Sequence, residues 1–189
     1  DIEIRPPDIN TSGLRFSVDD GTIRFGLGAI RGVGAAAAET ILEAREKGGT
    51  FKDLFDFCER VASGRVTKRV MEALCRCGAF DGFGLRRSQI FDMLDAAVSQ
   101  ASRRAADRAS GQGSLFDLDG FAEDDALKIE PPDLPEWPEH QILEDEKQLL
   151  GFYVTGHPLG QYAEIVETFS LDTVTDIMAG QEGPCDGRT

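Results

Sequence analysis

The stretch from Gly26 to Arg45, GLGAIRGVGAAAAETILEAR, constrains the fold more than any other part of the sequence. Glycine adopts a positive φ without a Cβ clash, so Gly32 and Gly34 predict a tight hairpin. A helical turn is expected before it at 27–31 and a helix after it at 35–45. Val33 is expected to fill the space between them. The four alanines after Gly34 combine high helix propensity with small side chains, which favours close packing. The stretch therefore predicts a helix-hairpin-helix.

The start of this second helix is a candidate anion site. Backbone N–H groups at a helix N-terminus have no intrahelical acceptor, and the helix dipole favours negative charge there. Contacts to a DNA phosphate are therefore predicted for Gly32, Val33, Gly34 and Ala35, with Arg31 as an added positive charge. Such contacts hold a DNA backbone without reading base sequence. The alternative is a turn between two packed helices that contacts no ligand.

The net charge of −14 is concentrated in the second part of the chain. Residues 1–110 carry 17 Lys and Arg against 16 Asp and Glu, whereas residues 111–189 carry 3 against 18. Only the first part is therefore electrostatically suited to lie on a phosphate backbone.

The remaining signals predict a mainly α fold that opens with a small β-hairpin. Alternation of apolar and polar residues predicts strands at 14–18 and 22–25, after an entering connection at 1–12. Thr50 and Thr67 are the expected N-caps of two helices, and Gly78 is the expected end of the second. The expected helical ranges are 51–61, 68–77, 86–98 with fraying towards 108, 139–150 and 159–169.

A more degenerate copy of the helix, glycine turn and helix pattern follows near residues 78–86. Basic side chains lie at its ends, and we name them as candidate DNA contacts: Lys68, Arg69, Arg86 and Arg87. A solvated basic face that binds no ligand is the alternative.

The sequence gives no sign of a metal site or a membrane segment. The four cysteines show no C-x-x-C spacing and the two histidines lie far from them, so no zinc site is predicted. No apolar run is long enough to span a bilayer, and no signal-peptide pattern is present. A cytoplasmic protein is expected, and because it opens without Met we interpret it as a fragment of a longer chain.

The stretch GQGSLFDL at 111–118 places two large apolar residues in a glycine-rich, non-helical region. Exposed Leu115 and Phe116 are costly unless they dock against something. The stretch therefore resembles a short linear motif that orders on binding a partner, with intramolecular packing as the alternative. An acidic, proline-rich run follows to Pro138.

Three pieces in this order, IRFGLGAIRGVG, GQGSLFDL and EKQLLGFYVTGHPLGQY, resemble the alpha (catalytic) subunits of bacterial DNA polymerase III, the replicative C-family polymerases. The resemblance covers most of the chain and implies four regions. These are the end of the fingers with the β-hairpin at 1–26, a tandem helix-hairpin-helix domain at 27–110, a clamp-binding motif with an acidic linker at 111–138, and a helical extension leading to an OB domain at 139–189.

The resemblance also implies roles for particular residues. Gly32, Val33 and Gly34 match the hairpin that holds duplex DNA behind the active site. Gly113 departs from the residue usual at the second position of the internal sliding-clamp motif, which bears on the strength of that contact. The residues that match the clamp motif are Gln112, Ser114, Leu115 and Phe116.

The expected partners are duplex DNA through its backbone, the sliding clamp (beta subunit) and other replisome subunits. The family's catalytic carboxylates and Mg²⁺ lie in a palm domain outside this stretch, so we assign no catalytic residue, metal ligand or cofactor here. The full-length chain would be a DNA-directed DNA polymerase, a nucleotidyltransferase. The clamp motif favours a replicative member of the family, with an accessory member as the alternative.

Two other functions compete with this interpretation. One is a protein-interaction scaffold whose hairpins only pack and whose functional element is the Leu115-Phe116 segment. The other is a repair enzyme or nuclease subunit with the same hairpin, which is disfavoured because no carboxylate cluster, Lys nucleophile or metal set stands out. A steep dependence of DNA binding on salt would favour phosphate contacts over the scaffold.

Overall fold

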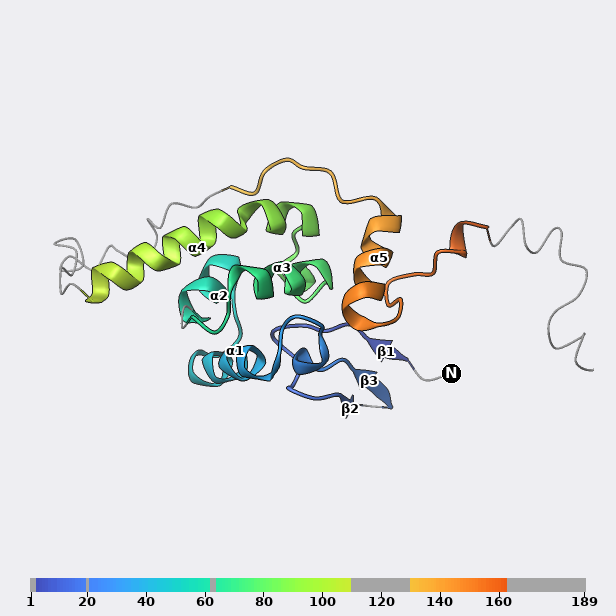
Figure 1. Cartoon of the computed structure of the whole chain (residues 1–189), viewed down its shortest axis with the longest axis horizontal. Helices are drawn as coiled ribbons and strands as arrows, with labels where there is room; N and C mark the ends of the chain where they lie inside the picture. The colour runs from blue at the N-terminus through green and yellow to red at the C-terminus, as the bar shows by residue number, and fades with distance from the viewer. Residues whose placement is uncertain (1–2, 20, 62–63, 110–129, 163–189) are drawn as a thin grey trace, which may run out of the picture. The chain divides into compact units, whose positions relative to one another are not determined.

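The computed structural model describes residues 3–19, 21–61, 64–109 and 130–162. The chain divides into two units, 1–155 and 156–189, and the second contains one described element, the 3₁₀ turn η4 (Gly160–Tyr162). The first unit is mainly helical with a small N-terminal sheet, which confirms the predicted fold class (Figure 1). Its elements are β1 (Ile4–Arg5), β2 (Ser17–Asp19), β3 (Thr22–Arg24), η1 (Leu27–Ala29), α1 (Ala35–Gly48), α2 (Leu54–Val61), α3 (Lys68–Arg76), η2 (Asp81–Phe83), α4 (Arg87–Ala109) and α5 (Glu139–Leu150).

The sheet has three strands in the order β1-β3-β2. β2 and β3 form the predicted antiparallel hairpin, but β1 pairs in parallel with β3 and lies in the stretch that we expected to be a connection. β2 also starts later than predicted, because residues 13–14 pair with the first turn of the glycine stretch instead of β3. The N–H of Leu27 donates to Gly13 O at 2.8 Å, and that of Gly28 donates to Leu14 O at 3.0 Å.

Two glycines permit this close approach. A Cβ at Gly26 would lie 2.3 Å from the carbonyl carbon of Arg15, and one at Gly28 would lie 2.9 Å from Leu14 O. Contacts this short leave no room for a side chain, so the backbones meet only because both residues are glycine. We predicted roles for the later pair, Gly32 and Gly34, but not for Gly26 and Gly28.

The start of α2 corrects a predicted cap. The helix begins at Leu54 because the Asp53 side chain accepts hydrogen bonds from the N–H groups of Phe55 and Asp56, each at 2.9 Å. Asp53 therefore takes the capping role that we expected of Thr50. The other predicted cap is confirmed, since Thr67 Oγ1 accepts from the N–H of Val70 at the start of α3.

Helix α4 runs further than its sequence predicts. It continues to Ala109, beyond the point where fraying was expected, and lies across α2 and α3 (Figure 1). Arg104 and Arg108 near its end both form ion pairs with Glu59 of α2. This tertiary pairing accounts for the extra turns. Among the described helices, none has the length and apolar character that a membrane span requires.

The hydrophobic core lies among α1, α2, α3 and α4, and α5 packs on α3. Phe57 at the centre of α2 contacts both Phe51 and Phe80 edge to face, with ring centroids 5.1 and 5.0 Å apart. Cys58, Cys75 and Cys77 are buried here as small core residues.

Candidate nucleic-acid interface

The first hairpin has the backbone conformation that its glycines predict. Gly32 has φ +91° and Gly34 has φ +73°. With ψ 156°, Gly34 occupies a region that is essentially restricted to glycine. Val33 between them is 4% exposed and belongs to the core, so it fills the space between η1 and α1 as expected.

The helix that follows this hairpin starts with an open N-terminus. No side chain caps α1, and its first turn carries no acidic residue. Gly34, Ala35 and Ala36 are exposed, and within the described chain a Cβ at Gly34 would meet no atom within 4 Å. Unsatisfied N–H groups and the positive end of the helix dipole therefore face solvent together, which favours an anion.

Neighbouring elements hold the hairpin in place. The N–H of Arg31 donates to Leu149 O at the end of α5 at 2.9 Å, and that of Val33 donates to Ile30 O at 3.1 Å. The hairpin backbone is thus fixed by a helix more than one hundred residues later in the sequence. A rigid support of this kind keeps the N–H groups oriented for a ligand.

Two of the predicted cations are exposed, one in the first hairpin and one on the helix next to it. Arg31 is exposed at the hairpin itself. Arg69 is exposed on α3, one turn before Ala73. The Cβ of Ala73 lies 4.0 Å from the position that a Cβ at Gly32 would take. Since residues four apart share a helix face, Arg69 lies on the face of α3 that borders the hairpin. Among the described residues, neither guanidinium forms an ion pair.

Two other predicted cations are exposed but already have protein partners. Lys68 Nζ lies 2.6 Å from Asp95 Oδ1, and this hydrogen bond raises the pKa of the ammonium group. Arg86 donates to Leu134 O at 2.7 Å. Both side chains are therefore partly engaged, unlike Arg31 and Arg69.

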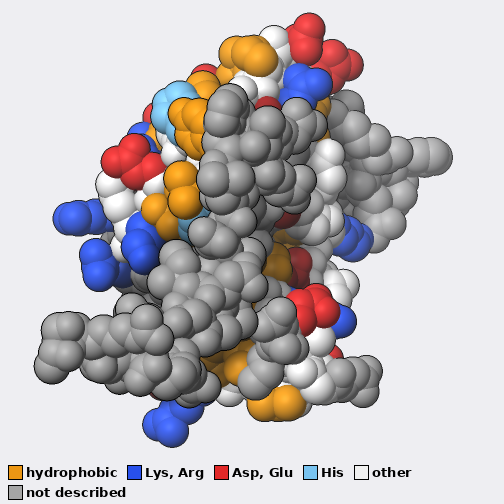
Figure 2. All heavy atoms as spheres, turned by 90° about the vertical axis from the view of Figure 1, so that its right-hand side faces the viewer, with side chains coloured by type: hydrophobic (Ala, Val, Ile, Leu, Met, Phe, Trp, Pro, Cys, Tyr) orange, Lys and Arg blue, Asp and Glu red, His pale blue; other side chains and the backbone are white. Residues whose placement is uncertain are grey.

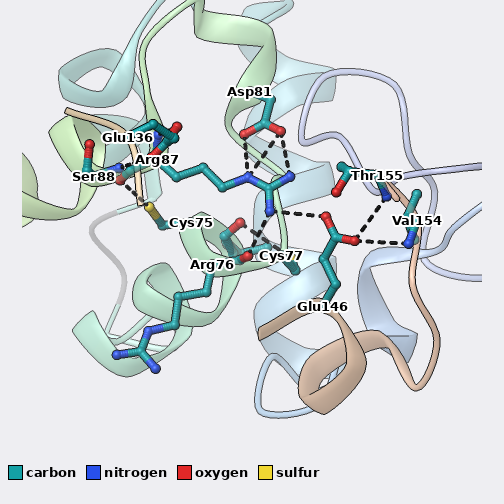
Figure 3. A network of polar contacts seen from close by, with 11 residues as sticks. Cys75, Arg76, Cys77, Asp81, Arg87, Ser88, Glu136, Glu146, Val154 and Thr155 are labelled. Atoms are coloured by element: carbon teal, nitrogen blue, oxygen red, sulfur yellow. Dashed lines mark hydrogen bonds and ion pairs between the residues drawn. The ribbon is translucent and has the colours of Figure 1, made fainter. Parts of the chain in front are cut away.

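Arg87 corrects the predicted set of DNA contacts. Its side chain is 4% exposed and its guanidinium lies inside a buried network (Figure 3). It donates to both carboxylate oxygens of Asp81, to Glu146 Oε1 at 3.1 Å and to Arg76 O at 3.2 Å. Burial lowers the pKa of Arg87, but Asp81 and Glu146 more than offset this and raise it overall. Its donors are therefore directed inward and not towards a surface ligand.

Glu146 on α5 completes this network and was missed from the sequence. It is fully buried, and its second oxygen accepts from the N–H groups of Val154 and Thr155 at 2.9 and 3.0 Å (Figure 3). The network joins η2, the start of α4 and the loop after α5. The buried charges thus fix α5 against the second hairpin.

A segment that we call the strap, residues 130–137, lies along the start of α4. Gln89 Nε2 donates to Pro132 O at 2.8 Å, and the rings of Trp137 and Phe91 lie 5.4 Å apart. The Glu136 carboxylate accepts from the N–H groups of Arg87 at 2.8 Å and Ser88 at 3.1 Å. The helix of the second hairpin therefore begins with a carboxylate in place, whereas the helix of the first does not.

On the face drawn in Figure 2, Lys and Arg side chains project at the left and also at the top, right and bottom, among hydrophobic and acidic groups. The candidate clamp residues Gln112, Ser114, Leu115 and Phe116 lie outside the described residues, between the end of α4 and the strap in sequence. Among the described residues, no group of three or more His, Cys, Asp or Glu side chains is placed to hold a metal ion.

The glycine hairpin, its buried valine and the open helix end together define a helix-hairpin-helix protein. In agreement, a family described as "Helix-hairpin-helix motif" matches residues 1–90. The geometry and this match thus agree on a helix-hairpin-helix protein. The family is identified by relatives that are much longer than this chain.

The chain is 46% identical over 164 residues to DNA polymerase III subunit alpha of Vibrio cholerae, and 40% identical over 171 residues to that of Escherichia coli K12. It is 42% identical over 182 residues to that of Caulobacter vibrioides. These alignments cover 85%, 89% and 96% of the chain, but only 14%, 14% and 16% of the relatives. The chain belongs to the family of DNA polymerase III alpha subunits and spans a small part of their length.

Proposed function

We propose that this chain is the DNA-backbone-binding and sliding-clamp-binding module of a DNA polymerase III alpha subunit. The observation that carries the DNA-binding part is the open N-terminus of α1, exposed at Gly34 to Ala36 and flanked by Arg31 and Arg69. A duplex phosphate at this end would accept hydrogen bonds from successive backbone N–H groups. The hairpin would then hold DNA of any sequence.

The clamp-binding part is carried by Gln112, Ser114, Leu115 and Phe116 through their likeness to the family motif. A tether to a ring on DNA raises the effective concentration of the hairpin near the duplex, and this supports processive synthesis. Such a module works within a replisome in the bacterial cytoplasm. On this proposal, nucleotidyl transfer and Mg²⁺ binding would take place in a palm domain outside this stretch, as the family resemblance implies.

The DNA-binding part is tested by anisotropy titrations of a labelled duplex at several salt concentrations. Each lost phosphate contact lowers the slope of log affinity against log salt by about 0.9, so we expect Arg31→Gln and Arg69→Gln each to lower it by that amount. Lys47→Gln is the matched control, since it removes one charge at the far end of α1, ~20 Å away along the helix axis. Weak, salt-insensitive binding by the wild type would contradict phosphate contacts.

The clamp-binding part is tested by calorimetry of the full chain with its own sliding clamp. The double variant Leu115→Ala/Phe116→Ala removes the groove-filling side chains and is expected to abolish binding. Phe121→Ala/Leu127→Ala, an apolar pair beyond the 111–118 stretch, is the control and should bind like the wild type. Equal binding by all three proteins would refute the assignment.

A protein-interaction scaffold is the competing function, and one observation favours it for the second hairpin. The helix end there is already occupied by Glu136 and its Arg87 is buried. Clamp binding together with salt-insensitive DNA association would establish the scaffold for both hairpins.

A further inference from the structure

The outer strand of the N-terminal sheet presents large apolar side chains to solvent. β2 stands at one end of the strand order β1-β3-β2, and Figure 1 shows it at the outer side of the sheet. All of its residues are exposed. Val18 at its centre is 76% exposed, and Phe16, directly before the strand, is 50% exposed. Edge strands are commonly protected by lysines, prolines or bulges, whereas the centre of this edge carries apolar residues at alternate positions.

The backbone polar groups of Val18 point away from the sheet. The N–H of Ile23 in β3 donates to Glu3 O at 2.9 Å, so the polar groups of Ile23 are directed towards β1. Residues opposite each other in an antiparallel pair exchange either both hydrogen bonds or neither. Val18 lies opposite Ile23, so these two residues exchange none. The N–H and C=O of Val18 are therefore left for a strand on the other side of β2.

Phe16 repeats this orientation two residues earlier. Extended residues two apart share a face and a hydrogen-bonding side. The register of β2 and β3, continued by one residue, places Phe16 opposite Phe25, and their rings lie 4.5 Å apart, edge to face. The N–H of Phe25 donates to Arg5 O at 3.2 Å, again towards β1. Phe16 and Val18 thus both direct an N–H and a C=O to the open side.

The charges beside these residues make the edge complementary to a second copy of itself. Arg15 and Asp19 are exposed and lie two positions before and after Ser17. Among the described residues, neither forms an ion pair. Two antiparallel copies with Ser17 opposite Ser17 would bring Arg15 of each copy opposite Asp19 of the other. Opposite charges that face each other across two strands stabilise their pairing.

The same register also uses the outward backbone groups and the apolar side chains. It places Phe16 of each copy opposite Val18 of the other, with their polar groups directed at each other, so that each pair exchanges two hydrogen bonds. The four apolar side chains then lie together on one face of the joined sheets. A register centred on Val18 would instead place Arg15 opposite Gly21 and lose the ion pairs. Charge and hydrogen bonding therefore select one arrangement.

We propose that this chain self-associates through the free edge of β2, as a two-fold dimer joined by antiparallel pairing of residues 15–19. The two three-stranded sheets then form one continuous sheet. The interface is isologous, which is the usual symmetry of homodimers. Because the paired segment is short, the dimer is weak and reversible. It uses none of the residues assigned to DNA or to the clamp, so it stands or falls separately from the proposed function.

Sedimentation equilibrium of the full chain tests the dimer. The mass of the wild type should rise from one chain towards two between about 10 μM and about 1 mM, the range expected of a short interface. Val18→Pro removes an N–H that β3 does not use, so the monomer should stay folded while the dimer is lost. Val18→Thr keeps the N–H and the β-branched shape, and it should dimerise.

Two results would overturn the proposal. A wild type that stays monomeric throughout this range would mean that another partner or segment covers the edge. Dimerisation of a folded Val18→Pro protein would mean that the copies meet through another surface.

Charge exchange tests the register. Asp19→Arg places like charges opposite each other at both ends of the paired segment, and it should weaken the dimer roughly tenfold. Glu39→Arg, at an exposed position on α1, makes the same change in net charge and should leave the dimer unaffected. Arg15→Asp/Asp19→Arg restores opposite charges and should dimerise like the wild type. A double variant as weak as Asp19→Arg would overturn the register.

Amide hydrogen exchange locates the interface. The amides of Phe16 and Val18 should exchange more slowly as the protein concentration rises, whereas the amide of Ser17, which faces β3, should not change. A rise in mass without slower exchange at Phe16 and Val18 would also overturn the proposal.

Discussion

Substitution of Arg87 by Met tests whether this side chain belongs to the buried network and is not a DNA contact. Arg87→Met removes the donors to Asp81, Arg76 O and Glu146. Asp81 is 45% exposed and can regain water, but Glu146 is fully buried and would keep only the Val154 and Thr155 amides. Breaking one half of a buried ion pair costs about 3–5 kcal/mol. For a chain of this size that corresponds to a fall in Tm of roughly 10 °C.

Chemical denaturation of the full chain measures this loss. Arg86→Met is the matched control, since the neighbouring arginine is 51% exposed and should change the free energy of unfolding by less than about 0.5 kcal/mol. Arg87→Met/Glu146→Gln should regain much of the loss, because no unpaired charge then remains buried. If Arg87→Met were as stable as the control and bound DNA more weakly, the placement of Arg87 inside the protein would be refuted.

Three further variants test single features. Gly34→Ala should cost about 1–3 kcal/mol of stability because of its backbone conformation, and it should also weaken duplex binding. Gly49→Ala is the control, because Gly49 has φ +74° at the other end of α1 and its substitution should lower stability alone. Gly26→Ala should lower the Tm further than Gly34→Ala, because its Cβ would lie 2.3 Å from backbone. Burial raises the pKa of Asp145, whose Oδ2 has no hydrogen-bond partner among the described residues, so its ionised form destabilises the fold above that raised pKa. Asp145→Asn should therefore raise the Tm at pH 7 and lose this advantage as the pH falls through about 4, where Asp becomes protonated in the unfolded state as well.

Features with local sequence signals were predicted well. The glycine hairpin, the buried Val33, the Thr67 cap and the helix at 139–150 each follow from residues a few positions apart, and the structure has all four. β1 was missed because two paired residues between a charged start and two prolines leave no alternating pattern to detect. The end of α4 depends on Glu59, which is distant in sequence.

The polar groups around the second hairpin were beyond sequence reasoning for a similar reason. Arg87 meets Glu146 and Glu136 across 59 and 49 positions, and a charged residue carries no sign of its own burial. Because Arg87 follows a glycine turn in sequence, we predicted that it lies on the surface with Arg86. The tertiary fold alone shows that one of these neighbours is interior and the other exposed.

The central claim is that the open end of α1 holds a DNA phosphate, and an amide NMR titration of the full chain with a short duplex tests it most directly. We expect the backbone amides of Gly34, Ala35 and Ala36 to shift together as duplex is added, and added salt to reverse the shifts. If duplex binds while these amides stay unmoved, DNA is held elsewhere and the assignment of the first hairpin is contradicted.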